Sequence, residues 1–309
     1  MIRSEEAPTH IATDPKSSRS KLTIGLIFIL ALWAQFCFAL IPSWEGGTYY
    51  DYGWLVPPLI VMLAYLRWQD HKAPIVETKP QGQLQLLIVM GLLALIPIRI
   101  VEHVDALWRL PLWAHVGILL GLTHLTLAAV YGWARSIYLL PATGLILVAV
   151  PLPTFIQGHL VDALTESVVS LSSNILPIFG YPSIRSGTGF IVDGKVLDVA
   201  EGCSGIRSFQ SCIMAALALG ELRRFKIFTR VIFVLLALGV AVLANCARIV
   251  SLTKIAFMQG HEAMDKAHDS VGMKTAIATY ALVFAVSLLL ASFSGGRKKK
   301  KAKVVRRKS

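Results

Sequence analysis

Long apolar runs alternate with short polar segments along most of this chain. A helix that crosses a bilayer needs about 20 mainly apolar residues, and eight runs approach that length. They cover residues 22–41, 50–67, 84–101, 112–132, 136–154, 204–220, 230–247 and 274–293. The second run is the weakest because Pro57 and Pro58 interrupt it. The pattern predicts an all-α polytopic membrane protein with about eight transmembrane helices.

The longest predicted loop, residues 155–203, has a different pattern. Its first part, GHLVDALTESVVSLSSNIL, places apolar residues at helical spacing, which predicts an amphipathic helix lying at the membrane interface. Its second part places Asp193-Gly194 between two short apolar stretches, and Asp-Gly in that setting is a strong signal for a β-hairpin. We therefore expect an external amphipathic helix and a small hairpin over residues 188–199, directly before the sixth span.

Composition and charge support a membrane protein and suggest its orientation. The 309 residues are 55% hydrophobic and 16% charged, with a mean hydropathy of +0.63, which excludes an ordinary soluble domain. Cytoplasmic loops are enriched in Lys and Arg. With a cytoplasmic N-terminus, 21 of the 30 Lys and Arg residues lie on the inner side, and 12 of the 18 acidic residues lie on the outer side. Both termini are therefore predicted to be cytoplasmic, in a multi-pass protein of the cytoplasmic membrane.

The chain is expected to divide into three regions. Residues 1–21 form a polar cytoplasmic lead, and the long apolar run after it indicates a retained first helix rather than a cleaved signal peptide. Residues 22–293 form the transmembrane domain, and residues 294–309 form a basic cytoplasmic tail. We interpret the tail as a stop signal that contacts anionic membrane lipid. A nucleic-acid partner is not expected directly after a span.

Three chemically reactive residues fall on the predicted outer face. Cys203, in the stretch AEGCSGIRS, directly precedes the sixth span, where the helix dipole favours a thiolate. Arg248 ends the seventh span, and His268 lies in the loop before the eighth. A thiolate nucleophile, a histidine acid or base and an arginine that stabilises an oxyanion are together suited to acyl transfer through a thioester.

Neighbours of these three residues are candidates for supporting roles: Glu201, Ser204, Arg207, Asn245 and Asp269. Asn245 lies three residues before Arg248, so the two share a helical face, and Asn245 is expected to orient Arg248 or to donate to an oxyanion. Glu201 is expected to pair with Arg248 or Arg207, or to remain solvated. Arg207 is expected either to lower the pKa of Cys203 or to anchor the helix at the interface.

The motifs resemble, in order and position, those of the exosortase/archaeosortase family of integral membrane cysteine transpeptidases. AEGCSGIRS is similar to the family's cysteine motif, NCAR at 245–248 to its Asn-x-x-Arg motif, and HDSVG at 268–272 to its histidine motif. YYDYGWLVPP at 49–58 and VPLP at 150–153 are further matches. In the first of these, Tyr50-Asp51-Tyr52 stands where a Ser-His pair is common.

The resemblance implies a cysteine protease or transpeptidase that acts on exported proteins. Such enzymes recognise a C-terminal signal made of a short motif such as Pro-Glu-Pro, a transmembrane helix and a basic tail, and they cut on the outer side of the membrane. By motif position, Cys203 would be the acyl-thioester nucleophile. Arg248 would be the proton donor or oxyanion stabiliser, and His268 the acid, base or transition-state stabiliser. Release to water and transfer to a lipid-linked or polysaccharide-linked acceptor both remain open, and no cofactor or metal is expected.

Two other classes of protein remain alternatives. A membrane transporter usually carries ionisable residues at mid-bilayer, and His124, near the middle of the fourth span, is the strongest argument for one. A thiol-disulfide oxidoreductase needs paired cysteines on the outer face, and Cys203 and Cys246 could serve. The outer histidines show no fixed metal-ligand spacing, which argues against a metal hydrolase.

Overall fold

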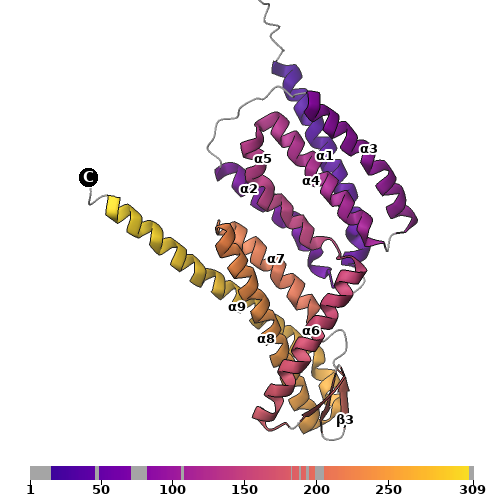
Figure 1. Ribbon diagram of the computed structural model, residues 1–309, viewed down its shortest axis with the longest axis vertical. Helices are drawn as coiled ribbons and strands as arrows, with labels where there is room; N and C mark the ends of the chain where they lie inside the picture. Colours follow the sequence, from indigo (N-terminus) through magenta and orange to yellow (C-terminus); the bar gives the residue numbers. More distant parts are fainter. Residues whose placement is uncertain are drawn as a thin grey trace, which may run out of the picture.

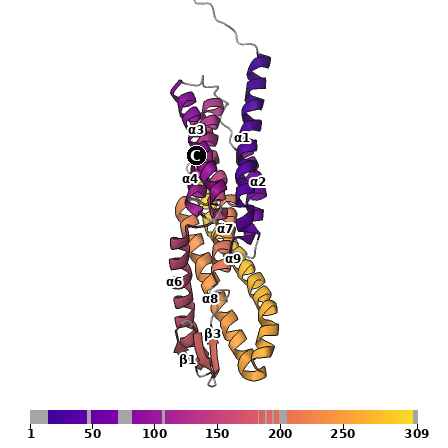
Figure 2. The ribbon, with the colours of Figure 1, turned by 90° about the vertical axis from the view of Figure 1, so that its right-hand side faces the viewer.

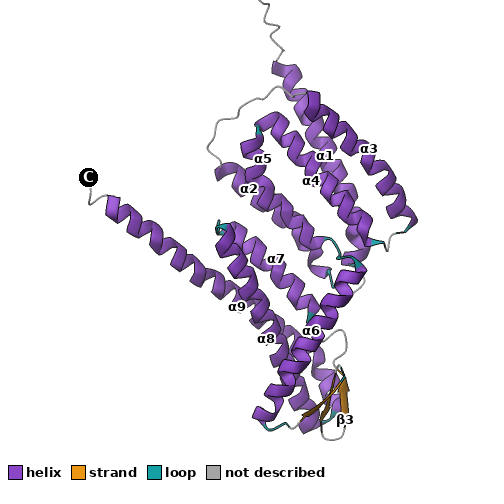
Figure 3. Ribbon diagram, in the orientation of Figure 1, coloured by secondary structure: helices purple, strands orange, loops and turns teal. Residues whose placement is uncertain are grey.

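The computed structural model describes residues 15–45, 49–70, 82–105, 108–181, 183–187, 189–192, 195–198 and 205–305. Helices dominate this part of the chain, and the strands form a single small sheet (Figure 3). The protein is therefore an all-α polytopic membrane protein, as its apolar pattern predicts. Within the described part, five helices are long and apolar enough to cross a membrane, or six if one bent pair counts as a single span.

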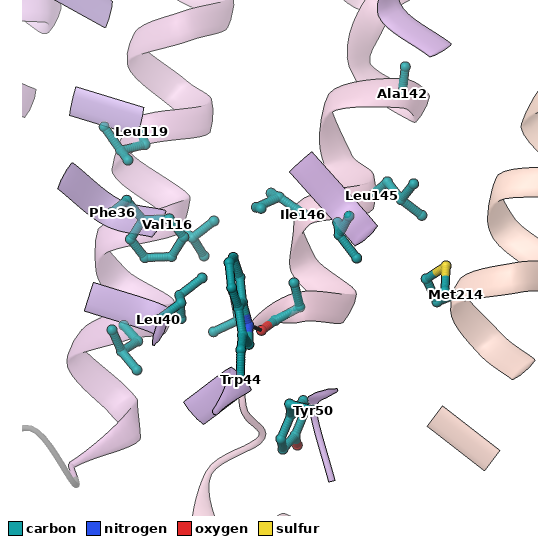
Figure 4. Close-up of a cluster of buried hydrophobic side chains, with 14 of the residues drawn as sticks. Phe36, Leu40, Trp44, Tyr50, Val116, Leu119, Ala142, Leu145, Ile146 and Met214 are labelled. Carbon is teal, nitrogen blue, oxygen red and sulfur yellow. Dashed lines mark hydrogen bonds between the residues drawn. The ribbon is translucent and has the colours of Figure 1, made fainter. Parts of the chain in front are cut away.

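The first half of the chain forms one helical bundle (Figure 1). Its elements are α1 (Pro15–Trp44), the 3-10 helix η1 (Asp51–Leu55), α2 (Val56–Asp70), α3 (Gly82–Val104), α4 (Arg109–Tyr131), α5 (Trp133–Thr143) and the 3-10 helix η2 (Gly144–Ala149). Its core contains Phe36, Leu40, Val116, Leu119 and Ile146, which are at most 1% exposed and point toward one another in Figure 4.

The second half contains three long helices and the sheet. Its elements are α6 (Thr154–Ile175), the 3-10 helix η3 (Leu176–Phe179), β1 (Ser183–Ser186), β2 (Gly189–Val192), β3 (Lys195–Asp198), α7 (Ile206–Leu222), α8 (Ile227–Gln259) and α9 (His261–Val305). In Figures 1 and 2 the second half of α6, the sheet and the turn from α8 to α9 form a lobe at the end of the molecule opposite to the start of α1.

Each of the eight apolar runs in the sequence overlaps a helix, but the helices differ in length. The fifth run, 136–154, covers most of the 11-residue α5, the 3-10 helix η2 and the non-helical residues 150–153. Helices α2 and α7 have 15 and 17 residues, or about 22 and 26 Å at 1.5 Å per residue, which is less than a hydrocarbon core of about 30 Å. Pro57 and Pro58 do not interrupt α2, because the helix begins at Val56 and both prolines fall in its first turn, where no N–H is needed. The total of eight spans stays a prediction.

The prediction of a loop between the last two spans is wrong, because these residues are helical apart from a break at Gly260. Helix α8 continues past Arg248 to Gln259, and α9 begins at His261 after a break at Gly260, whose φ is +89°. The extension has a buried stripe at helical spacing, formed by Ile249, Leu252 and Ala256. Because Ile249 and Ala256 of this stripe pack with residues of α6, the helix does not end at the membrane boundary that hydropathy suggests.

The expected amphipathic helix and hairpin are both present. Val161, Leu164, Val168 and Val169 form the buried face of α6, and the second half of this face packs against α8. Strands β2 and β3 pair antiparallel, with Val192 opposite Lys195 and therefore two residues in the hairpin loop. The sequence did not indicate β1, which pairs with β2 on its other side. The interfacial position expected for α6 stays a prediction; the chain bends by 81° where α6 follows α5 and η2.

Candidate active site

The side chains of Arg248 in α8 and His268 in α9 are in contact near the turn that joins these two helices. Arg248 Nη2 lies 3.0 Å from His268 Nε2. A guanidinium group can only donate, so Nε2 accepts this hydrogen bond and carries no proton. The neutral imidazole then has its proton on Nδ1, which lies 3.3 Å from Asp269 Oδ1. The described geometry therefore leaves a basic nitrogen of His268 directed at the guanidinium.

Gly272 of α9 lies next to the Arg248 guanidinium. Gly272 lies one helical turn after His268, so the first and last residues of the HDSVG motif are on one face of α9. A Cβ added at Gly272 would lie 3.5 Å from Arg248 Nη2 and 3.6 Å from its Cζ. These are ordinary van der Waals distances, so the guanidinium lies beside Gly272 with room for a methyl group there, whereas a longer side chain would meet it.

Asn245 connects the same face of α8 to the start of α7. Its side chain is buried at 4% exposure, and it lies against Gly205, the residue before the first turn of α7. A Cβ added at Gly205 would lie 2.7 Å from Asn245 Nδ2, and the φ of Gly205 is +79°. Only glycine satisfies both conditions without strain. Asn245, which shares a face of α8 with Arg248, therefore lies beside the N-terminus of α7.

Cys203, Glu201 and Ser204 lie outside the described residues, so their expected roles stay predictions. The description resumes at Gly205, two residues after Cys203. Cys246, the other half of the expected redox pair, is a free thiol with 1% exposure. It packs with Val168 and Val169 of α6 rather than on the face of α8 that carries Asn245. This burial argues against the oxidoreductase alternative.

Arg207 pairs with a residue that sequence reasoning missed. Its Nε lies 3.7 Å from Asp51 Oδ2, and both side chains are about half exposed. Asp51 belongs to η1, which connects α1 to α2, so the pair joins the beginning of the chain to the first turn of α7. The only signal in the sequence was the YYDYGWLVPP stretch, whose polar residues were not assigned a role.

Tyr50 is a second residue without an assigned role that supports the start of α7. It is 2% exposed, and its hydroxyl accepts hydrogen bonds from Leu152 N at 2.8 Å and Gln210 Nε2 at 3.0 Å, and donates to Gln157 Oε1 at 3.2 Å. Tyr50 thereby joins α7, the start of α6 and the VPLP segment.

Aromatic side chains also satisfy the carbonyl groups around the VPLP segment. Trp44 Nε1 donates to Ala149 O at 2.9 Å, a bond visible in Figure 4. Tyr52 Oη donates to Val148 O at 2.7 Å, and Trp113 Nε1 donates to Pro151 O at 2.9 Å. These bonds satisfy carbonyls that the irregular backbone between η2 and α6 cannot pair within a helix. They attach η2 and the segment before α6 to the bundle.

The histidine that favoured a transporter has a structural explanation. His124 Nδ1 lies 3.0 Å from Ser136 Oγ, and Nε2 lies 2.8 Å from Thr143 Oγ1. Both ring nitrogens are therefore hydrogen-bonded between α4 and α5 within the bundle. Among the described residues, no group of three or more His, Cys, Asp or Glu side chains is arranged to hold a metal ion.

A comparison with protein families places the chain. The family model described as transmembrane exosortase matches residues 44–290, which include every described residue of the site. The chain belongs to the transmembrane exosortase family. No curated protein and no solved structure matches this exosortase-family chain.

Proposed function

We propose that this membrane protein is a cysteine protease or transpeptidase with Cys203 as its nucleophile. Its substrates would be exported proteins with the C-terminal sorting signal described above, and cleavage would occur on the outer face of the cytoplasmic membrane, with both termini of the chain inside. The observation that carries the proposal is the contact between Arg248 and His268 beside Asn245 and Gly205. Two residues of chain span at most about 7 Å, so the Cα of Cys203 lies no farther than this from the Cα of Gly205, the residue that contacts Asn245.

The geometry supports separate roles for His268 and Arg248, proton transfer for the first and charge stabilisation for the second. The lone pair of His268 Nε2 accepts a hydrogen bond from Arg248 in the resting site; once Arg248 turns from it to the oxyanion, Nε2 would take the proton of the Cys203 thiol and return it to the leaving amine. A guanidinium holds its proton at any physiological pH, which suits Arg248 to stabilise the oxyanion of the tetrahedral intermediate. Asn245, on the same face of α8, would orient Arg248 or donate to that oxyanion.

The reaction would proceed in two halves. Cys203 Sγ forms a bond to the scissile carbonyl carbon, the carbon–nitrogen bond breaks, and the amine of the released signal takes the proton held by His268. The resulting thioester is then attacked by water, or by an amine or hydroxyl of a lipid-linked or polysaccharide-linked acceptor. In both cases the attacking group loses a proton to His268, and the thiol is regenerated.

The test is processing of a co-expressed substrate that carries a tripartite C-terminal signal. We expect Cys203→Ala to abolish processing while the protein remains inserted in the membrane. Cys37→Ala, a half-buried thiol in α1, is the matched control and should process normally. Normal processing by Cys203→Ala would overturn the proposal. Loss of processing in Cys246→Ala, at unchanged protein level, would favour the oxidoreductase alternative instead.

A further inference from the structure

The small sheet is held to the lobe by one of its two edges. Strand β1 packs on α6, and Arg185 of β1 donates a hydrogen bond to the Glu166 carboxylate of α6. Phe190 of β2 is 1% exposed and packs in the cluster that joins α6 to α8. The order β1-β2-β3 therefore places β3 at the edge that is farther from α6.

The outer edge of β3 carries backbone groups that β2 does not use. Among the residues that the structure describes, β3 pairs only with β2. The residues that flank a two-residue loop, Val192 and Lys195, form a hydrogen-bonded pair, and such pairs alternate along an antiparallel ladder. Val196 and Asp198 consequently direct their N–H and C=O groups away from β2. An edge of this kind can pair with another extended chain.

This edge is close to the proposed nucleophile along the chain. Strand β3 ends at Asp198, five residues before Cys203. Figure 2 shows β1 on the α6 side of the sheet and β3 on the side of α9, the helix that carries His268. The sheet lies in the lobe, at the opposite end of the molecule from the start of α1 (Figure 1).

We propose that the β3 edge binds the extended segment of a substrate protein that precedes the scissile bond, which adds to the sheet as a fourth strand. This inference rests on the proposed function. The transmembrane helix of the substrate follows the scissile bond and stays in the membrane, so the segment before the bond is the part that can reach the lobe. Pairing through main-chain groups would hold the scissile carbonyl beside Cys203 while accepting varied side chains.

Disulfide cross-linking tests the pairing directly. Val196→Cys is introduced into a Cys203→Ala background, and single cysteines are placed at successive positions before the cleavage site of a co-expressed substrate. We expect cross-links at alternate substrate positions, because side chains of a strand alternate between two faces. Cross-links at no position, or equally at every position, would overturn the proposal. Either result leaves the proposed function standing if Cys203→Ala still abolishes processing.

A kinetic experiment provides the second measurement. Val196→Pro removes the outward N–H, and proline is tolerated on an edge strand when its nitrogen faces away from the sheet. We expect KM for the substrate to rise about five- to tenfold with kcat little changed, the loss of one net hydrogen bond. Ile184→Thr, at a 70% exposed position of β1 away from the β3 edge, is the control and should keep the wild-type KM. Wild-type KM in Val196→Pro would overturn the proposal, and if this variant fails to fold, the cross-linking pattern decides.

Discussion

Arg248 and His268 are 20 residues apart in the chain, yet their side chains meet with Nη2 3.0 Å from Nε2. The contact exists because Gly260 ends α8 and the chain returns at once as α9. The helical turns on both sides of Gly260 therefore carry the two residues of the candidate site to the same level. Each residue limits the orientation of the other, so the pair is expected to act as a unit.

Arg248→Lys should reduce substrate processing by at least about 100-fold, the scale seen when one oxyanion donor is lost. Lysine keeps the charge but lacks the planar fork that can donate to His268 and to an oxyanion at once. The measurement is the initial rate of processing, normalised to the amount of inserted protein. Arg99→Lys, in an i,i+3 ion pair with Glu102 in α3, is the control. A wild-type rate in Arg248→Lys would remove Arg248 from the site.

Gly205→Ala should destabilise the protein by about 2 kcal/mol or more. Alanine at a φ of +79° is strained by roughly 1–2 kcal/mol, and its Cβ would overlap the Asn245 side chain. Gly121→Ala is the matched control, because nothing lies within 4 Å of its added Cβ and alanine favours a helix. Thermal unfolding in detergent should show a lower Tm for Gly205→Ala only. An unchanged Tm would mean that Gly205 and Asn245 are not in contact.

Tyr50→Phe should lower stability by about 1–3 kcal/mol, because it leaves the Leu152 N–H and the Gln210 amide without their shared acceptor in a buried site. The matched control is Tyr65→Phe, on the exposed face of α2 at 60% exposure. The measurement is again Tm, together with the processing rate. Equal Tm values for the two variants would show that the Tyr50 hydroxyl does not support α7.

Glu221→Gln, near the C-terminal end of α7, should lower the free energy of unfolding of the protein by about 3–5 kcal/mol. Glu221 is 1% exposed and accepts hydrogen bonds from Arg67, Arg224 and Arg230, so its removal leaves buried cations without their carboxylate. Glu262→Gln breaks only an exposed i,i+4 pair with Lys266, which is worth about 0.5 kcal/mol or less. Comparable losses of stability in both variants would contradict the structure at Glu221.

The orientation of the protein can be read from thiol labelling in a Cys203→Ala background. Ile178→Cys places a thiol at a position 80% exposed in the lobe, and Leu222→Cys places one at the far end of α7, 47% exposed in the wild type. A membrane-impermeant maleimide added to intact cells should label only the first, whereas permeabilised cells should show both. The reverse pattern would invert the proposed topology.

Much of the fold could be predicted because the hydropathy and periodicity of neighbouring residues determine where helices and strands form. Apolar runs identified the helices, the spacing in residues 158–176 identified the buried face of α6, and Asp193-Gly194 predicted the hairpin that the pairing of β2 with β3 fits. The end of α8 could not be predicted in this way. Its last turns are stabilised by Val168 and Val169 of α6, contacts that hydropathy along a single segment does not report.

The supporting residues of the site were harder to predict than the central ones. Arg248 and His268 were expected at one membrane depth, and their direct contact follows that expectation. Asp51 and Tyr50 were not expected, because each acts through a residue more than 100 positions away, Arg207 in one case and Gln210 in the other. Such long-range pairs depend on how α7 packs beside η1, which no local pattern encodes.

The sequence by itself determined that this is a helical membrane protein and which segments are helices, and it provided the candidate side chains for acyl transfer. These properties depend on the transfer energy and periodicity of neighbouring residues, and on motifs a few residues long. Only the tertiary structure decided that Arg248 bonds to His268, that Gly205 leaves room for Asn245, and that the sheet is anchored by β1 rather than β3. These relationships arise from packing between distant segments, where close contact and the pairing of buried polar groups select one arrangement.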